Sequence, residues 1–195
     1  FHLAWTLRKH AASFLGVQET QALLDGLEPT CPALVREATQ KVPPVLLTEV
    51  LRRLVSEGVS IRNLRAILEA LCEPTATLPG PEAEAPTVSE LTERARRALR
   101  RHLCHRLAPE GTLVTLLVDP AVEQALRQSR RPQSAEPEAL ALPPEQAIAL
   151  VDGLKQALRG AQSGVVLTAP DLRRGLRELI AGTFPDVAVL AYPEL

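Results

Sequence analysis

The clearest pattern of apolar positions lies in residues 44–72, which are predicted to form two short amphipathic helices joined by a turn. On the first helix the pattern repeats at i, i+1, i+4 and i+5, through Leu46, Leu47, Val50, Leu51, Leu54 and Val55. On the second, the stripe consists of Ile61, Leu64, Ile67, Leu68 and Leu71. Gly58 is expected to end the first helix in a left-handed conformation, and Ser60 to cap the second. The pattern predicts a helical hairpin whose apolar stripes must be covered by a third surface.

The pattern on either side of this hairpin divides the chain into two kinds of structure. Before it, helices are predicted over 1–15, 18–27 and 32–40. Residues 73–86 contain four prolines and no apolar periodicity, which is typical of a linker. After them strands and helices alternate. Strands are expected at 112–118, 139–142, 165–168 and 187–191, and helices at 88–106, 120–130, 144–159 and 170–181. The expected fold class is therefore mixed α+β: an all-α part, then a small α/β part with a short sheet packed by helices.

Domain boundaries follow from the same pattern. Residues 1–16 are expected to be the end helix of a preceding subdomain, and 17–78 a helical subdomain. A proline-rich linker at 79–86 would lead to a C-terminal α/β subdomain at 87–195.

Composition limits the class of protein further. The chain is 46% hydrophobic and 23% charged, which indicates globular structure rather than disorder. The net charge of -1 gives no general attraction to nucleic acid or anionic lipid. Cys31, Cys72 and Cys104 are odd in number and scattered, so free thiols in a reducing compartment are expected. No apolar run reaches the roughly 18 residues of a membrane helix, and no signal peptide is recognisable. Because the chain contains no Met and begins within a helical pattern, we expect it to be a fragment.

Sequence motifs for catalysis or cofactor binding are missing. His102, Cys104 and His105 lie close together, but no further ligands accompany them at zinc-site spacing, so no metal site is predicted. There is no Gly-x-Ser-x-Gly motif and no phosphate-binding glycine loop. Catalytic and cofactor-binding residues are predicted to be absent, cofactors likewise, and the protein is not expected to be an enzyme.

Charge is concentrated in the helix expected at 88–106. Arg94, Arg97 and Arg101 share one face, with Arg96 and Arg100 beside them. A solvated helix face is the favoured interpretation, followed by a surface for an acidic protein, and then by nucleic-acid binding. The hairpin at 45–72 could likewise be a DNA-reading helix–turn–helix, with Arg62, Asn63 and Arg65 on its second helix. Few aromatic residues are available for stacking on bases, so no nucleic-acid partner is expected.

Several segments resemble one protein family, in order and at the expected spacing. The most specific is EGVSIRNLRAILEAL at 57–71. The others are FLGVQET at 14–20, LLDGLE at 23–28, PALVRE at 32–37, LTAPDLRR at 167–174 and FPDVAVLAYPEL at 184–195. Together they resemble the FHIPEP family, the large export-gate proteins of type III secretion systems. The likeness is closer to the virulence (injectisome) branch than to the flagellar branch. It is interrupted at the linker and at 127–137.

The resemblance implies a fold and a function. It implies a winged-helix-like helical subdomain followed by an α/β subdomain, in the cytoplasmic part of a bacterial inner-membrane protein. Only the missing N-terminal region would contact the membrane. The implied role is a homo-oligomeric ring, a nonamer in this family, which docks secretion chaperones and their cargo. The ring would work with other export-apparatus proteins and the secretion ATPase complex.

Residue roles under this interpretation are expectations about surfaces. Subunit contacts are expected at the charged side chains flanking the hairpin turn: Arg53, Glu57, Arg62 and Arg65. Partner binding is expected on the outer face of the α/β subdomain: Asp171, Arg173 and Arg174. The alternative function left open is a helix–turn–helix DNA-binding regulator. An enzyme of unknown type remains a third class, for which no residue nominates a substrate.

Overall fold

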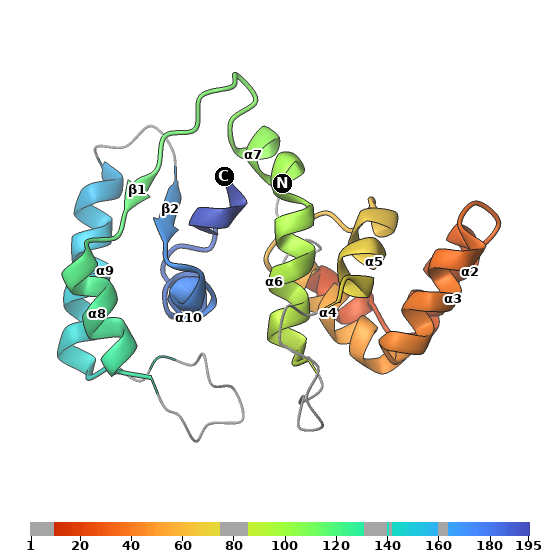
Figure 1. The fold of residues 1–195 in the computed structure, drawn as a ribbon. Coiled ribbons are helices and arrows are strands. Elements are labelled where there is room, and N and C mark those ends of the chain that lie inside the picture. Colours follow the sequence, from red (N-terminus) through yellow and green to blue (C-terminus); the bar gives the residue numbers. More distant parts are fainter. Residues whose placement is uncertain (1–9, 75–85, 131–139, 141, 160–163) are drawn as a thin grey trace. The chain divides into compact units, whose positions relative to one another are not determined.

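The computed structural model describes residues 10–74, 86–130, 140, 142–159 and 164–195. Contacts divide the chain into two compact units, Phe1–Arg100 and Arg101–Leu195. The described part of the first unit is helical, and the second combines helices with a small sheet (Figure 1). The mixed fold class expected from the sequence is therefore confirmed.

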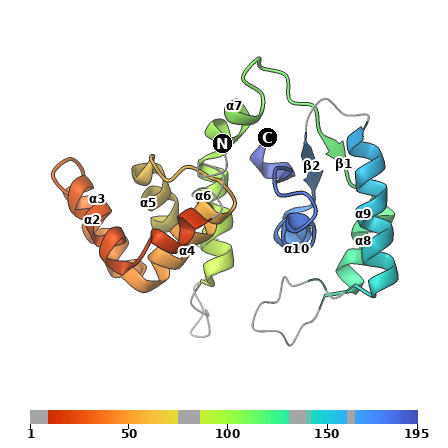
Figure 2. The ribbon, with the colours of Figure 1, turned by 180° about the vertical axis from the view of Figure 1, so that it is seen from behind.

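In the residues that the structure describes, the helical unit comprises a short 3₁₀ helix and five α-helices. Their bounds are η1 Ala11–Phe14, α2 Val17–Leu27, α3 Pro32–Lys41, α4 Pro44–Ser56, α5 Leu64–Cys72 and α6 Val88–Ala98. Helices α2 and α3 lie side by side (Figure 2). Proline stands at the start of α3 and of α4, where its missing amide hydrogen has no helical partner to lose. Four of the six stripe residues predicted on α4 are at most 1% exposed, namely Leu47, Val50, Leu51 and Leu54, whereas Leu46 and Val55 are partly exposed.

The turn between α4 and α5 follows the prediction at Gly58 and departs from it at Ser60. Gly58 has a φ of 70°, the left-handed conformation expected there. Helix α5 begins at Leu64 rather than at Ile61, because Asn63 is its N-cap and accepts a 3.2 Å hydrogen bond from the amide of Ala66. The hydroxyl of Ser60 accepts a longer bond, 3.4 Å, from the amide of Arg62 within the turn.

Replacing Gly58 with alanine is expected to lower the free energy of unfolding by about 1 kcal/mol, because a side chain is strained at positive φ. Gly26 is a matched control: it lies inside α2, and a Cβ built there meets nothing within 4 Å. Gly26→Ala should stabilise by about 0.5 kcal/mol through helix propensity. Urea denaturation of both variants checks the pair. Equal effects of the two substitutions would contradict the role given to Gly58.

Helix α6 completes the helical unit. A capping box begins it: the Thr87 hydroxyl accepts from the amide of Glu90, and the Glu90 carboxylate accepts from the amide of Thr87. Leu91, Ala95 and Leu99 are almost completely buried, and α6 packs against α4 and α5. This helix thus covers the apolar stripes of the hairpin. The contacts group it with the first unit, whereas the sequence pattern assigned everything after residue 86 to the second.

The described part of the second unit contains a three-stranded parallel sheet in the order β1-β2-β3. The strands are β1 Leu116–Leu117, β2 Val165–Thr168 and β3 Ala188–Ala191. The remaining elements are α7 Arg100–Leu107, α8 Pro120–Gln128, α9 Pro144–Arg159, α10 Pro170–Ala181 and η2 Tyr192–Glu194. Strand β2 is central and buried at every position. That burial explains its uninterrupted apolar and β-branched sequence.

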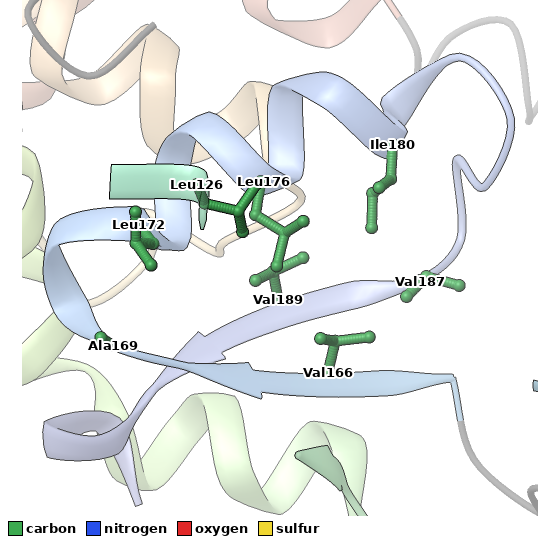
Figure 3. Packing of buried hydrophobic residues seen from close by; sticks show 8 residues of the cluster. All are labelled: Leu126, Val166, Ala169, Leu172, Leu176, Ile180, Val187 and Val189. Carbon is green, nitrogen blue, oxygen red and sulfur yellow. The ribbon is translucent and has the colours of Figure 1, made fainter. Parts of the chain in front are cut away.

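The core of this unit lies between the sheet and α10. Figure 3 shows Leu172, Leu176 and Ile180 on the face of α10 that points toward Val166 and Val189 of the strands. Partly buried side chains of α9 pack against the same cluster, among them Leu150, Leu154 and Leu158. Helix α8 contributes Leu126. Three helices therefore hold the sheet through one apolar cluster.

Two predicted elements differ from the structure. The strand expected at 112–118 pairs with β2 only at Leu116–Leu117, and Leu117 is 63% exposed, so it is not buried on both faces. As an edge strand, β1 has one neighbour in the sheet. The helix expected at 88–106 is two helices, because the backbone at Leu99 leaves the helical conformation, with φ -88° and ψ 5°. No glycine or proline marks this break, so the pattern could not locate it. Residues 139 and 141 of the strand expected at 139–142 lie outside the described residues. Leu140, which is described, forms a single antiparallel bridge with Arg130.

Candidate interaction surfaces

A buried ion pair lies behind the hairpin turn of the helical unit. Arg96 of α6 is 3% exposed, and its Nη1 lies 2.7 Å from Oε2 of Glu57, whose side chain is 15% exposed. Removing either partner of an ion pair shielded from water in this way strongly destabilises the folded protein. The carboxylate of Glu57, expected from sequence to contact another subunit, is thus engaged within its own unit. The sequence placed Arg96 in a basic stripe but did not suggest this pairing.

The other three residues of the predicted subunit contact lie on the same hairpin with different exposures. Arg62 and Arg65 are exposed, and Arg53 is partly buried. Arg65 Nε is 2.8 Å from Glu69 Oε1, and both side chains are at least half exposed. Exposed pairs of this kind contribute little to stability. The turn therefore presents the side chains of Arg62 and Arg65 to solvent, whereas the side chain of Glu57 is largely buried against Arg96.

An open apolar hollow of about 460 Å³ is formed by α2, α4 and the first residue of α6. Its lining includes the apolar Val17, Val45, Leu46 and Val88, together with the charged Glu49 and Arg52. Val45 is 69% exposed and Val17 is 45% exposed. A hollow of this size with apolar walls can hold an apolar side chain.

The most connected polar group of the α/β unit is Glu123, in the first turn of α8. Its Oε1 accepts hydrogen bonds from the hydroxyl of Thr168 at 3.0 Å, the amide of Ala169 at 2.7 Å and the hydroxyl of Tyr192 at 3.2 Å. These donors come from the end of β2 and the residue after β3. One buried carboxylate therefore ties together the carboxyl edge of the sheet, α8 and the C-terminal 3₁₀ helix. Burial and the neighbouring charge of Glu123 raise the pKa of Tyr192 above its ordinary value.

Asp171 extends this network to the surface. Its carboxylate accepts two hydrogen bonds from Arg127, at 2.9 and 3.2 Å, and lies 3.6 Å from Nη1 of Arg130. Arg127 in turn is 3.6 Å from Oε2 of Glu123. The hydrogen bonds from Arg127 hold the pKa of Asp171 below its ordinary value. Asp171 is therefore a charged, fixed group at the start of α10.

The structure separates the three residues predicted for partner binding. Asp171 keeps 38% of its side chain exposed. Arg174 is 12% exposed and donates a 2.8 Å hydrogen bond to Glu178 on its own helix. Arg173 is completely buried, so it does not lie on the outer face where the sequence placed it. Helix periodicity alone distinguishes Leu172 and Leu176 as core positions, but not the neighbouring arginine.

Glu123 and Arg127 were missed by sequence reasoning, although a signal for them exists. Glu123 follows three residues after Pro120, at the start of a helix that leaves a parallel strand. Side chains in that position face the carboxyl edge of the sheet. Arg127 is one helical turn further on the same face.

Features of a metal site or a membrane span do not occur in the parts of the chain that the structure describes. No three His, Cys, Asp or Glu side chains in those parts are grouped to hold an ion. Within them, no helix combines the length and the apolar composition that a membrane crossing requires. The three cysteines are free thiols.

Comparison with known proteins decides the family. The sequence matches the FHIPEP family over residues 1–195. The chain belongs to the FHIPEP family. Among curated relatives, the invasion protein InvA of Salmonella typhimurium is 36% identical over 197 residues, which cover 99% of this chain and 28% of InvA. The chain thus spans little more than a quarter of that relative.

Solved structures of FHIPEP relatives share the fold. The nonameric EscV cytosolic domain from the type III secretion system matches with a TM-score of 0.78 and 35% identity, over 95% of this chain and 54% of that one. The Chlamydia pneumoniae CdsV protein, in its complex with CdsO, matches with a TM-score of 0.84 and 34% identity, over 100% and 55%. The EscV domain is a nonamer in its solved structure.

Proposed function

We propose that this chain is part of a ring-forming cytoplasmic domain of a type III secretion export gate, and that the ring docks chaperone–substrate complexes for export. The observation that carries the proposal is the match of nearly the whole chain to a nonameric cytosolic domain of that system. The role requires binding surfaces rather than catalysis. The complete protein would be held in the bacterial inner membrane by a region upstream of this chain, with this part on the cytoplasmic side.

Subunit contacts are proposed at the hairpin turn. Arg62 and Arg65 are exposed there, and Arg53 lies on the preceding helix. A ring of head-to-tail subunits needs two different complementary patches, and opposite charges across such a contact mainly set its register. In this proposal Glu57 supports the subunit contact indirectly, because its ion pair with Arg96 holds the turn against α6.

Docking of partners is proposed at the start of α10. Asp171 presents a fixed negative charge there, and Arg127 and Arg130 lie beside it. CdsV, a relative, is described in a complex with CdsO. We extend from it only the general point that a FHIPEP cytoplasmic domain binds another protein. Chaperones with their cargo, other export-apparatus proteins and the secretion ATPase complex are the proposed partners.

Mass measurement by light scattering over a concentration series tests ring formation. We expect a chain extended upstream through the whole cytoplasmic region to form assemblies of about nine subunits, as its relatives do. Arg62→Glu in that longer chain should shift the assembly midpoint to about tenfold higher concentration, because a charge is reversed at the proposed contact. Arg36→Glu on exposed α3 is the control for net charge and should leave the midpoint unchanged.

A strict monomer or dimer at every concentration would contradict the ring. In that case, tight and salt-sensitive binding of duplex DNA by the same protein would favour the alternative, a helix–turn–helix regulator. If Arg62→Glu and Arg36→Glu shift the assembly midpoint equally, the ring would still be supported, but the hairpin turn would not be one of its subunit contacts.

A further inference from the structure

Strand β1 lies at an edge of the sheet in the α/β unit, and the stretch around it is apolar. Among the residues that the structure describes, β1 pairs only with β2, through Leu116 and Leu117. The surrounding stretch 112–118, TLVTLLV, consists of Thr, Leu and Val alone. Thr and Val favour strands, but only two residues of this stretch belong to β1. The stretch suited to strand pairing is therefore longer than the strand that it forms.

The register of β1 turns one side of its backbone toward β2 and the other side away from it. The amide of Val118 donates to the carbonyl of Leu167 at 3.0 Å. Because the backbone groups of a strand alternate between its two edges, the amide and carbonyl of Leu117 point away from β2. Within the described ranges, neither group of Leu117 has a hydrogen-bond partner. An edge of this kind is a template for a further strand.

Apolar side chains are exposed along this edge. Leu116 packs against the cluster between the sheet and α10, whereas Leu117 points to the opposite face and is 63% exposed. Val114 is 47% exposed. Proteins commonly protect an exposed edge strand with lysine or proline, and residues 112–118 contain neither. An exposed apolar edge without such protection is typical of a surface that pairs with another chain.

Acidic side chains stand at both ends of the stretch. Glu110 precedes it and Asp119 follows it, and both are exposed. No Lys, Arg or His occurs in the sequence between Arg106 and Arg127. A strand laid along β1 would therefore meet negative charge near each of its ends. Opposite charges on neighbouring strands attract, so Lys or Arg at those ends would match.

A second copy of this chain is a poor occupant of the edge. Two copies paired antiparallel through residues 112–118 would bring Glu110 of one copy near Asp119 of the other, and parallel pairing would bring each carboxylate near its equivalent. Like charges on neighbouring strands destabilise the pairing. Five residues of strand are about 17 Å long, too short for the roughly 1,200 Å² that a stable pair of proteins buries. A short basic-ended segment meets neither difficulty.

We propose that the β1 edge, defined as residues 114–118, binds an extended segment of a partner protein as a further strand of the sheet. Backbone hydrogen bonds to Leu117 would hold the segment, and apolar residues at alternate positions would cover the Leu117 side chain. Lys or Arg at its ends would face Glu110 and Asp119. This surface uses neither Asp171 nor Arg127 of the proposed docking site, and it does not depend on ring formation.

The test is titration of the 195-residue chain into the fluorescein-labelled peptide Arg-Val-Thr-Val-Thr-Val-Thr-Val-Arg, measured by fluorescence anisotropy. Leu117→Pro removes the outward amide but no hydrogen bond to β2, and it should weaken binding at least about tenfold. If this variant fails to fold, the unmodified chain is titrated into the same peptide N-methylated at its three central amides. An equal loss of affinity is expected, because this peptide lacks the donors for strand pairing.

Carboxylate variants test the charge match at the two ends. Glu110→Gln/Asp119→Asn should bind the peptide about fivefold more weakly. Asparagine keeps the N-cap that Asp119 supplies to α8 through the amide of Ala121. The control Glu145→Gln/Asp152→Asn removes two exposed carboxylates from α9, and it should change the affinity less than about twofold.

Hydrogen exchange resolved at single amides by NMR locates the bound peptide. At saturating peptide, exchange at the amide of Leu117 should slow about tenfold, because this amide gains an acceptor. The amide of Val118 is already bonded to Leu167, so its exchange should change less.

Three results would overturn the proposal. The first is the lack of measurable binding, or binding that N-methylation leaves unchanged, which would exclude strand pairing. The second is equal weakening by the two carboxylate variants, which would show a general charge effect. The third is self-association of the chain that Leu117→Pro abolishes, which would make a second copy the occupant of the edge.

Discussion

Glu57→Ala is expected to lower the free energy of unfolding of the helical unit by about 3 kcal/mol, although Glu57 stands in a surface turn. The substitution leaves the guanidinium of Arg96 almost completely buried, 3% exposed, without its carboxylate at 2.7 Å. A buried charge without its counter-ion retains the full cost of its desolvation. Urea denaturation followed by far-UV circular dichroism measures the loss.

Two further variants show whether the loss of stability in Glu57→Ala comes from the burial of Arg96 or only from the loss of an ion pair. Glu69→Ala removes an exposed pair with Arg65 and should cost less than about 0.5 kcal/mol. The double variant Glu57→Leu/Arg96→Met replaces both charges with apolar groups and should recover most of the stability lost in Glu57→Ala. A loss from Glu57→Ala as small as that from Glu69→Ala would contradict the assigned role of the buried pair. So would a double variant less stable than the single one.

Glu123→Ala is expected to destabilise the α/β unit by about 3 kcal/mol. Its Oε1 accepts three hydrogen bonds, two of them from buried groups: the hydroxyl of Thr168 and the amide of Ala169. Buried donors left without an acceptor carry the cost of their lost hydration. Hydrogen exchange resolved by peptide should show faster exchange in β2 and the first turn of α10. Exchange in α4 and α5 should remain unchanged.

Tyr192→Phe is the matched control for Glu123. It removes the third of these hydrogen bonds, a 3.2 Å contact made by a residue that is 42% exposed. We expect a loss below about 1 kcal/mol, because water replaces the missing hydroxyl. If Tyr192→Phe costs as much as Glu123→Ala, the stabilising contact is to the C-terminal 3₁₀ helix rather than to β2.

The two interactions matter for function because each holds a proposed binding surface. The pair of Glu57 and Arg96 fixes the hairpin turn on which Arg62 and Arg65 are exposed. The contacts of Glu123 fix the edge of the sheet beside Asp171. Rigid support of this kind lowers the entropic cost of binding a partner.

The order and type of the main elements could be predicted from the sequence because they depend on local signals. Apolar periodicity identified α4, α5 and α10, and proline and glycine marked several of their ends. The capping box at Thr87 and the left-handed Gly58 follow from side chains and backbone within four residues. The family could be inferred for a related reason, since its motifs are continuous stretches such as residues 57–71.

Tertiary structure decided what local patterns leave open. Sequence treats Glu57, Arg173 and Asp171 alike, as charged residues near turns or on helices. In the folded chain Glu57 forms a shielded ion pair, Arg173 is fully buried, and Asp171 remains partly exposed beside Arg127. Burial and pairing depend on residues distant in the sequence, 39 positions apart for Glu57 and Arg96 and 46 for Glu123 and Ala169. Periodicity within one element therefore determined the helices and strands, whereas the role of each charge was determined by the element packed against it.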